Sequence, residues 1–199
     1  MAFEWLGLYL QGFVTLFIIF DPIGNIPLFQ SFTTSFDYEK KRHIINNSVL
    51  IALLILVFFA VGGFFILDLF RTSINDFRIA GGILLFILSI EGLLGREEAR
   101  WMNREDVAVV PLATPLMAGP GAIYTVIYLM QAPYGPAIAF TAMLGNVVVQ
   151  WLLLFYSDKV LRLIGKTGST IISRIMAFIL SAIAIGMIRE GLLVIMQGL

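Results

Sequence analysis

The stretch FDPIGNIP, residues 20–27, decides the fold, because it places an acidic residue, two prolines and a glycine inside an apolar segment that extends from about residue 5 to residue 35. An apolar segment of this length is expected to cross a membrane as a helix. Proline within a helix removes a backbone hydrogen bond and clashes with the preceding turn. The stretch therefore predicts a membrane helix that is interrupted near its middle.

The residues around the interruption predict how the chain resumes. Asp is a preferred N-cap and Pro is preferred at the first helical position, so Asp21-Pro22 indicates the start of a new half-helix, and Pro27 offers a second possible start. Unpaired N–H groups at such a start survive in a membrane only around a protein-lined cavity. They also carry the positive end of the helix dipole, which favours a carboxylate ligand.

A second stretch, ATPLMAGPG at residues 113–121, repeats this pattern. Thr114-Pro115 and Pro120 lie 93 residues after Asp21-Pro22 and Pro27, and Thr is again a good N-cap. The two half-helices are expected to approach the middle of the membrane from opposite sides and to form one site there. The alternative is that both stretches are proline kinks that serve packing, with Asp21 acting only as a cap.

The composition agrees with a membrane protein. Hydrophobic residues make up 59% of the 199 residues and charged residues only 13%, which is about half the charge of a typical soluble domain. A net charge of zero gives no reason to expect nucleic acid as a partner, and the chain has no cysteine and a single histidine, His43. We expect an all-α polytopic membrane protein with six transmembrane helices, at about 5–35, 44–67, 77–95, 107–131, 136–157 and 172–196.

Further similarities between the two halves indicate an internal repeat. RIAGGIL at 78–84 resembles RIMAFIL at 174–180, and EGLL at 91–94 recurs at 190–193. We therefore expect a single transmembrane domain, 1–199, built from a repeat at about 1–95 and a repeat at about 107–199. Because each repeat has three spans, the second repeat must be inverted relative to the first, with helices 1 and 4 interrupted. Inverted repeats of this kind are typical of secondary transporters.

The basic residues predict the orientation. The loops after the first, third and fifth spans hold ten of the thirteen lysines and arginines, and cytoplasmic loops are enriched in these residues. We expect a multi-pass protein of the cell (inner or plasma) membrane with both termini outside. The ten are Lys40, Lys41, Arg42, Arg96, Arg100, Arg104, Lys159, Arg162, Lys166 and Arg174, against Arg71, Arg78 and Arg189.

Other polar residues in the spans are weaker candidates. Asp21 could meet a substrate ammonium or carry a coupling proton, because acids within membranes are costly and often functional. Asn47, Asn146 and Glu91 are possible supporting or coupling residues; the alternatives are interhelical hydrogen bonding for the asparagines and snorkelling of Glu91 to the inner interface. The expected close-packing positions between helices are Gly62, Gly63, Gly81, Gly82, Ser89, Ser181, Ala182 and Gly186. We predict neither a metal site nor a resident cofactor.

At DPIGNIP and PLATPLMAGPGAI the sequence resembles the MarC family, and the resemblance covers essentially the whole chain. The resemblance implies a small neutral amino-acid transporter, for glycine, alanine and similar substrates, coupled to a cation such as H⁺ or Na⁺. It places the substrate at the interrupted first and fourth helices. The substrate-binding residues expected there are Asp21, Pro22, Gly24, Asn25, Pro27, Thr114, Pro115, Gly119, Pro120 and Gly121.

The sequence thus favours a secondary active transporter that works by alternating access around a site at the middle of the membrane. Its expected partners are a small neutral amino acid and the lipid bilayer, and no oligomeric state is indicated. The alternatives are an intramembrane enzyme, and a channel or scaffold without amino-acid transport. We do not expect an enzyme, because no pair of catalytic aspartates is evident and His43 lies in a charged loop.

Overall fold

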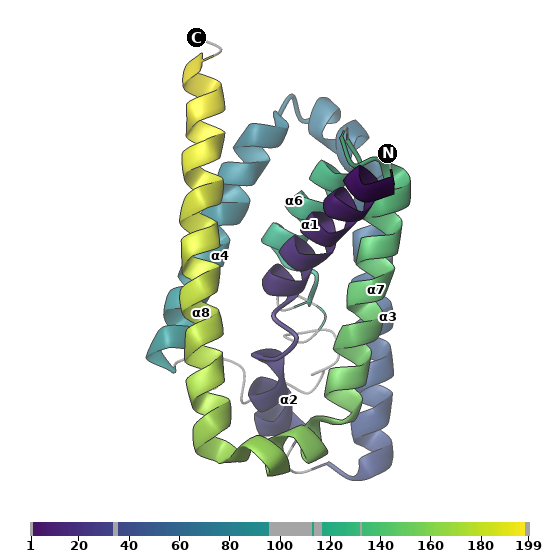
Figure 1. Ribbon diagram of the computed structural model, residues 1–199, viewed down its shortest axis with the longest axis vertical. Coiled ribbons are helices and arrows are strands. Elements are labelled where there is room, and N and C mark those ends of the chain that lie inside the picture. The colour runs from purple at the N-terminus through teal and green to yellow at the C-terminus, as the bar shows by residue number, and fades with distance from the viewer. Residues whose placement is uncertain (1, 34–35, 96–112, 114–116, 132, 198–199) are drawn as a thin grey trace.

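The computed structural model describes residues 2–33, 36–95, 113, 117–131 and 133–197, and in these residues the protein is all-α (Figure 1). Five helical segments are long and apolar enough to cross a membrane: Trp5–Gln30, Tyr38–Leu69, Ile74–Leu94, Pro136–Phe155 and Thr167–Gln197. The helices are α1 (Ala2–Phe20), α2 (Asn25–Thr33), α3 (Tyr38–Leu69), α4 (Ile74–Leu94), α6 (Pro120–Leu129), α7 (Pro136–Phe155) and α8 (Ser157–Gln197).

Five of the six expected spans therefore have a counterpart. The first is the broken pair α1 and α2, and α3, α4, α7 and the long part of α8 are the second, third, fifth and sixth. The expected fourth span, 107–131, lies largely outside the described residues. Its described part includes the short helix α6.

Local sequence explains where the helices begin and end. Asp37 caps α3 by accepting a hydrogen bond from the Lys40 amide at 2.8 Å. Ser73 and Asp76 form a capping box at the start of α4, in which each side chain accepts from the other's backbone amide. Gly95 ends α4 in the left-handed conformation at φ 66°, which glycine adopts without steric cost.

Helix α8 contains a sharp bend. Gly165 has φ 74° and ψ 166°, which is not helical, so α8 consists of a short segment, 157–164, and a long membrane-spanning segment after it. In Figure 1 the short segment runs across the lower end of the bundle and the long one rises beside α4. A side chain other than glycine would be strained at this bend.

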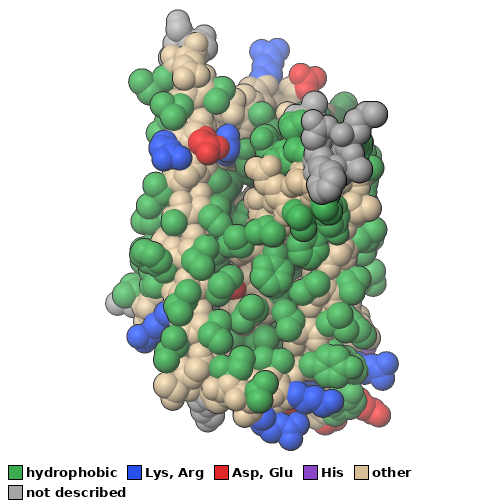
Figure 2. Space-filling view, viewed as in Figure 1, with side chains coloured by type: hydrophobic (Ala, Val, Ile, Leu, Met, Phe, Trp, Pro, Cys, Tyr) green, Lys and Arg blue, Asp and Glu red, His purple; other side chains and the backbone are tan. Residues whose placement is uncertain are grey.

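The start of α1 and the end of α8 lie at the upper end in Figure 1, whereas the starts of α3 and α8 lie at the lower end. The lower end therefore carries Lys40–Arg42 together with Lys159 and Arg162, and basic side chains gather there in Figure 2. We call it the basic end, and the opposite end the terminal end. At the basic end Lys41 lies 3.8 Å from Asp158, and Gln30 donates to Asp158 at 2.8 Å. Between the ends, large apolar side chains such as Phe65, 72% exposed, cover the outside, as expected of a lipid-facing surface.

The helices approach one another most closely at glycines. A methyl group added at Gly82 of α4 would lie 2.9 Å from the Ala184 carbonyl oxygen and 2.8 Å from Ile188 Cγ1, both on α8. One added at Gly81 would lie 3.3 Å from the Pro120 carbonyl oxygen at the start of α6. The predicted close packing at Gly81 and Gly82 is confirmed. The prediction for Gly186 is wrong, because a methyl group added there would meet nothing within 4 Å.

This difference yields a test of the α4–α8 contact. Gly82→Ala should destabilise the protein by about 1–3 kcal/mol through overpacking, whereas Gly186→Ala should be neutral or stabilising because alanine is the better helix former. Thermal unfolding in detergent should show a midpoint lowered by about 2–4 °C for each kcal/mol in Gly82→Ala alone. Equal midpoints in the two variants would contradict the close approach of α4 and α8.

Candidate functional site

The first interruption begins at Asp21. This residue has φ 45°, in the left-handed region, where Asp is one of the few non-glycine residues found with any frequency. Its amide donates to the carbonyls of Phe17 and Ile18, at 3.1 and 3.2 Å, and so closes the last turn of α1. Pro22 follows and has no N–H to continue the helix. The predicted break in the first span is therefore present, at residues 21–24.

The Asp21 side chain also stabilises the turn that leads into the next helix. Its Oδ1 atom accepts a hydrogen bond from the Gly24 amide at 3.0 Å, so Asp21 caps the turn 22–24 that precedes α2. A side chain at Gly24 would collide with the Asp21 carboxylate. The predicted starts at Pro22 and Pro27 are wrong by a few residues: α2 begins at Asn25, because the left-handed turn at Asp21 delays the helix, and Pro27 lies within its first turn.

Asn25 closes the interruption from the other side. Its side-chain amide donates to the Phe20 carbonyl at 2.8 Å, and both residues are almost fully buried. Without this bond the carbonyl at the end of α1 would lack a partner in a site away from water, which costs about 1–3 kcal/mol. Asn25 is therefore a structural residue of the break as well as a residue of the site.

The second interruption is built differently. The Ala118 amide donates to the Ala113 carbonyl at 2.8 Å, one residue further back than in an α-helix, and Gly119 is extended. Pro120 is the first residue of α6, and no side chain among the described residues caps this helix. The amides of Gly121 and Ala122 therefore present the positive end of the α6 dipole without an acceptor from a described side chain. Thr114 and Pro115, predicted as site residues, lie outside the described residues.

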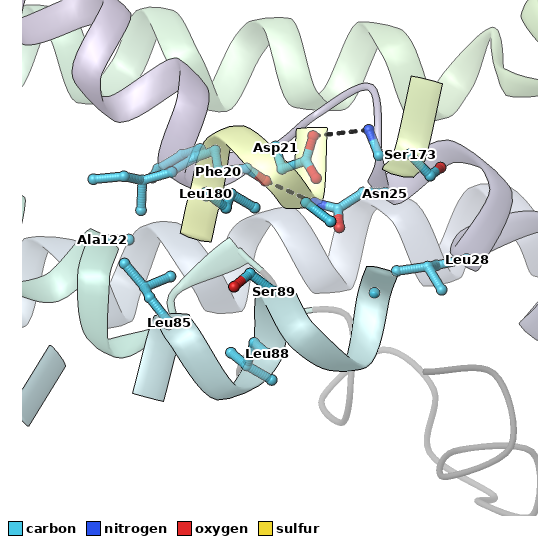
Figure 3. A pocket seen from close by; sticks show the side chains of 15 residues that line it. Phe20, Asp21, Asn25, Leu28, Leu85, Leu88, Ser89, Ala122, Ser173 and Leu180 are labelled. Atoms are coloured by element: carbon cyan, nitrogen blue, oxygen red, sulfur yellow. Dashed lines mark hydrogen bonds between the residues drawn. The ribbon is translucent and has the colours of Figure 1, made fainter. Parts of the chain in front are cut away.

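The two interruptions meet at one central cavity of about 70 Å³, which has room for several water molecules or one very small solute (Figure 3). Its walls are mostly apolar, and Asp21 is the one titratable residue among the described residues that line it. Its polar or backbone-exposing residues come from the first break, the second break, α4 and α8: Asp21, Gly24, Asn25, Ser89, Gly92, Gly119, Ala122 and Ser173.

Some of the predicted site residues line the central cavity, and others lie beside it. Asp21, Gly24, Asn25 and Gly119 line the central cavity. Pro22, Pro120 and Gly121 flank its lining, and Pro27 lines an adjoining cavity. Gly121 is tightly packed, since a side chain there would collide with Leu85.

The three supporting candidates lie elsewhere. The Asn47 side chain pairs with His43 at 3.0 Å near the basic end. Asn146 is buried between α7 and α1, where it donates to the Phe13 carbonyl at 3.1 Å and to the Ala142 carbonyl at 2.9 Å. Glu91 is half-buried on α4, next to Gly92 of the lining.

Sequence reasoning missed Ser89 and Ser173 as cavity residues. Ser89 was expected only to pack helices, and Ser173 lies just before the expected last span. In the structure the last apolar segment begins at Thr167, so Ser173 lies inside it. Helical periodicity is the signal that could have found it, because Ser173, Ala177 and Leu180 share one face of α8 and all three line the cavity.

The cavity differs toward the two ends of the bundle. A larger cavity of about 270 Å³ adjoins it on the side of Arg174 and Gly95, and the two cavities share Leu28, Gly92 and Ser173. Toward the terminal end, Arg78 of α4 forms an ion pair with Glu190 of α8. The Arg78 guanidinium also lies 5.5 and 5.9 Å from the ring centres of Tyr124 and Tyr128 on α6. This group of four residues, which we call the terminal-end cluster, joins three helices.

The fold and its central cavity define a multi-pass α-helical integral membrane protein. The model of the MarC family of integral membrane proteins matches residues 6–196, and the chain belongs to this family. A UPF0056 membrane protein of Archaeoglobus fulgidus is 40% identical, over 94% of this chain and 93% of that protein. The UPF0056 membrane protein YvbG of Bacillus subtilis is 32% identical, over 90% of this chain and 92% of that protein. No solved structure matches the chain.

The role of Asn25 in the break can be tested by replacing it, with the same replacement at Asn47 as a control. Asn25→Ala should lower the stability in detergent by about 1–3 kcal/mol, because it leaves the buried Phe20 carbonyl without a partner. Asn47→Ala removes a bond near the basic end to a side chain that remains in water and should change the stability by less than about 0.5 kcal/mol. If thermal unfolding gives the same midpoint for both variants, the Asn25–Phe20 bond does not hold the break together.

Proposed function

We propose that this protein is a secondary active transporter of small neutral amino acids, coupled to H⁺ or Na⁺, with its substrate in the central cavity. The observation that supports this most is the meeting of two helix interruptions of opposite character at one small cavity. Discontinuous helices at the middle of the membrane are the usual substrate sites of secondary transporters. Amino-acid transport is also what the resemblance of the two motifs implies.

The two interruptions suit the two charges of an amino acid. On one side the start of α6, with no side-chain cap, offers amide donors and a positive dipole end for the substrate carboxylate. On the other side α1 ends with the negative end of its dipole at Asp21, which lines the cavity. One oxygen of Asp21 is occupied by the Gly24 amide, and we assign the other to the substrate ammonium.

The size of the cavity favours glycine and alanine over larger amino acids. About 70 Å³ leaves little room beyond the amino and carboxyl groups, and Gly24, Gly92 and Gly119 in its lining contribute no side chains. Discrimination between such close homologues should be modest, since one methylene in a pocket changes the binding free energy by only about 1–3 kcal/mol.

The contacts between helices support two inverted repeats. If α3 corresponds to α7 and α4 to α8, the packing of α4 on α6 has its equivalent in the packing of α8 on α2. The packing of α6 on α3 likewise has its equivalent in that of α2 on α7. Helices of each half of the bundle thus pack against the interrupted span of the other half. This arrangement is compatible with alternating access by rocking of the two halves.

We assign the basic end to the cytoplasm, and both termini to the outside, because cytoplasmic loops are enriched in lysine and arginine. The central cavity continues toward this end through the cavity of about 270 Å³, whereas the terminal-end cluster joins α4, α6 and α8 on the other side. We therefore interpret the described arrangement as open toward the cytoplasm, with the terminal-end cluster as the outer gate.

The alternatives are less well supported. An intramembrane enzyme would need paired acidic residues or a nucleophile with a base, and Asp21 is the single titratable group among the described cavity residues. A channel would need a path to both ends at once, but the described helices are joined by the cluster at the terminal end. A protein that served only as a scaffold would not need a cavity between two helix breaks.

Purified protein in liposomes tests the proposal. The wild type should take up labelled glycine and alanine under an imposed pH or Na⁺ gradient, and empty liposomes should not. Asp21→Asn keeps an oxygen that can accept from Gly24 but removes the charge, so uptake should fall by about 10-fold or more. Asp68→Asn, an exposed carboxylate at the end of α3, is the matched control and should retain uptake. Wild-type liposomes that move neither amino acid would refute the proposed substrate.

The outer gate can be tested by charge reversal. Arg78→Glu and Glu190→Arg should each reduce uptake strongly, because each places two like charges together in the terminal-end cluster. The double variant, which exchanges the two charges, should recover a substantial part of the uptake. Arg189→Glu, one residue away on α8, is the control. No recovery in the double variant would mean that the ion pair itself does not matter for transport.

A further inference from the structure

Ser173 has the one buried hydroxyl oxygen without a hydrogen-bond partner among the described residues. In most helical positions a buried Ser or Thr side chain bonds back to a carbonyl of its own helix. Five described hydroxyls do so, with donor–acceptor distances of 2.7–2.8 Å: Thr33, Ser48, Ser89, Thr125 and Ser181. The Ser173 Oγ atom is buried and has no hydrogen-bond partner within the part of the chain that the structure describes. A buried polar atom without a partner is uncommon in a native protein and needs an explanation.

The position of Ser173 explains why its hydroxyl group has no partner. It lines the central cavity together with Asp21 (Figure 3). It also lines the larger cavity toward the basic end. The other two residues that α8 adds to the central cavity, Ala177 and Leu180, are apolar. Ser173 is thus the one polar side chain of α8 in this lining, and it stands where the two cavities join.

We propose that Ser173 is a substrate-binding residue whose hydroxyl oxygen accepts a hydrogen bond from the ammonium group of the bound amino acid; this rests on the proposed function. A primary ammonium has three N–H donors and no acceptor. The Asp21 carboxylate provides an acceptor on the side of the first break. Ser173 provides another from α8, so that the ammonium is bound by both halves of the bundle.

The geometry also predicts a substrate that binds without the hydrogen bond to Ser173. N-methylglycine has one N–H fewer, and its methyl group needs space beside the nitrogen. Such space lies at the junction of the two cavities, where Ser173 stands. N-methylglycine should therefore bind without the Ser173 hydrogen bond, whereas glycine should use it.

Two variants and two substrates form the test. The half-saturating concentration for uptake into liposomes is measured for glycine and N-methylglycine with wild type, Ser173→Ala and Ser181→Ala. Ser173→Ala should raise the value for glycine about 3- to 10-fold, as expected for one hydrogen bond, and leave that for N-methylglycine unchanged. Ser181→Ala is the matched control on the same helix and should change neither. Ser173→Thr keeps the hydroxyl and should stay closer to wild type than Ser173→Ala for glycine.

The outcomes separate this role from the proposed function. If Ser173→Ala binds glycine like wild type, or weakens both substrates equally, the assigned hydrogen bond is wrong although transport stands. If Ser173→Ala unfolds, Ser173→Thr must still favour glycine over N-methylglycine by the wild-type ratio, and a changed ratio overturns the proposal. If wild type transports neither substrate, the proposed function fails and the role of Ser173 with it.

Discussion

A backbone that is broken inside a membrane must satisfy its own amides and carbonyls, because no water from the lipid side can do so. The two interruptions meet this constraint in opposite ways. The first is closed by side chains, with Asp21 on the Gly24 amide and Asn25 on the Phe20 carbonyl. In the second, no described side chain caps α6, and the helix begins with Pro120, which lacks an N–H. The difference makes the cavity electrically asymmetric, and the proposed zwitterionic substrate depends on this asymmetry.

The close packing of α4 fixes the positions of the two halves relative to each other around the cavity. Gly82 lets α4 approach the backbone of α8, and Gly81 lets it approach Pro120 at the start of α6. One helix thus touches both the second interruption and the long helix that carries Ser173. A small rotation of α4 against α8 would change the distance between these two walls, and any such motion must also separate or carry along Arg78 and Glu190 at the terminal end.

The first interruption, its Asp21 cap, the long apolar helices and the close packing at Gly81 and Gly82 could be predicted because proline, glycine and N-cap residues act locally. Interactions between distant segments could not be predicted in this way. The bond from Asn25 to Phe20 depends on the left-handed turn at Asp21, and the pair of Arg78 and Glu190 joins residues 112 positions apart. Ser173 was missed because the charged residues around it indicated a loop, whereas the helix extends through them.

The bend at Gly165 has a consequence for how the protein sits in bilayers of different thickness. The segment Thr167–Gln197 has 31 residues, and a helix of that length spans roughly 46 Å, well beyond the roughly 30 Å of hydrocarbon. Helix α8 must therefore tilt or project, and in Figure 1 its C-terminal end does extend past its neighbours. Because the preceding segment, 157–164, is joined to it by a single glycine, α8 can adjust its tilt to hydrophobic mismatch while that segment stays at the level of the lipid headgroups.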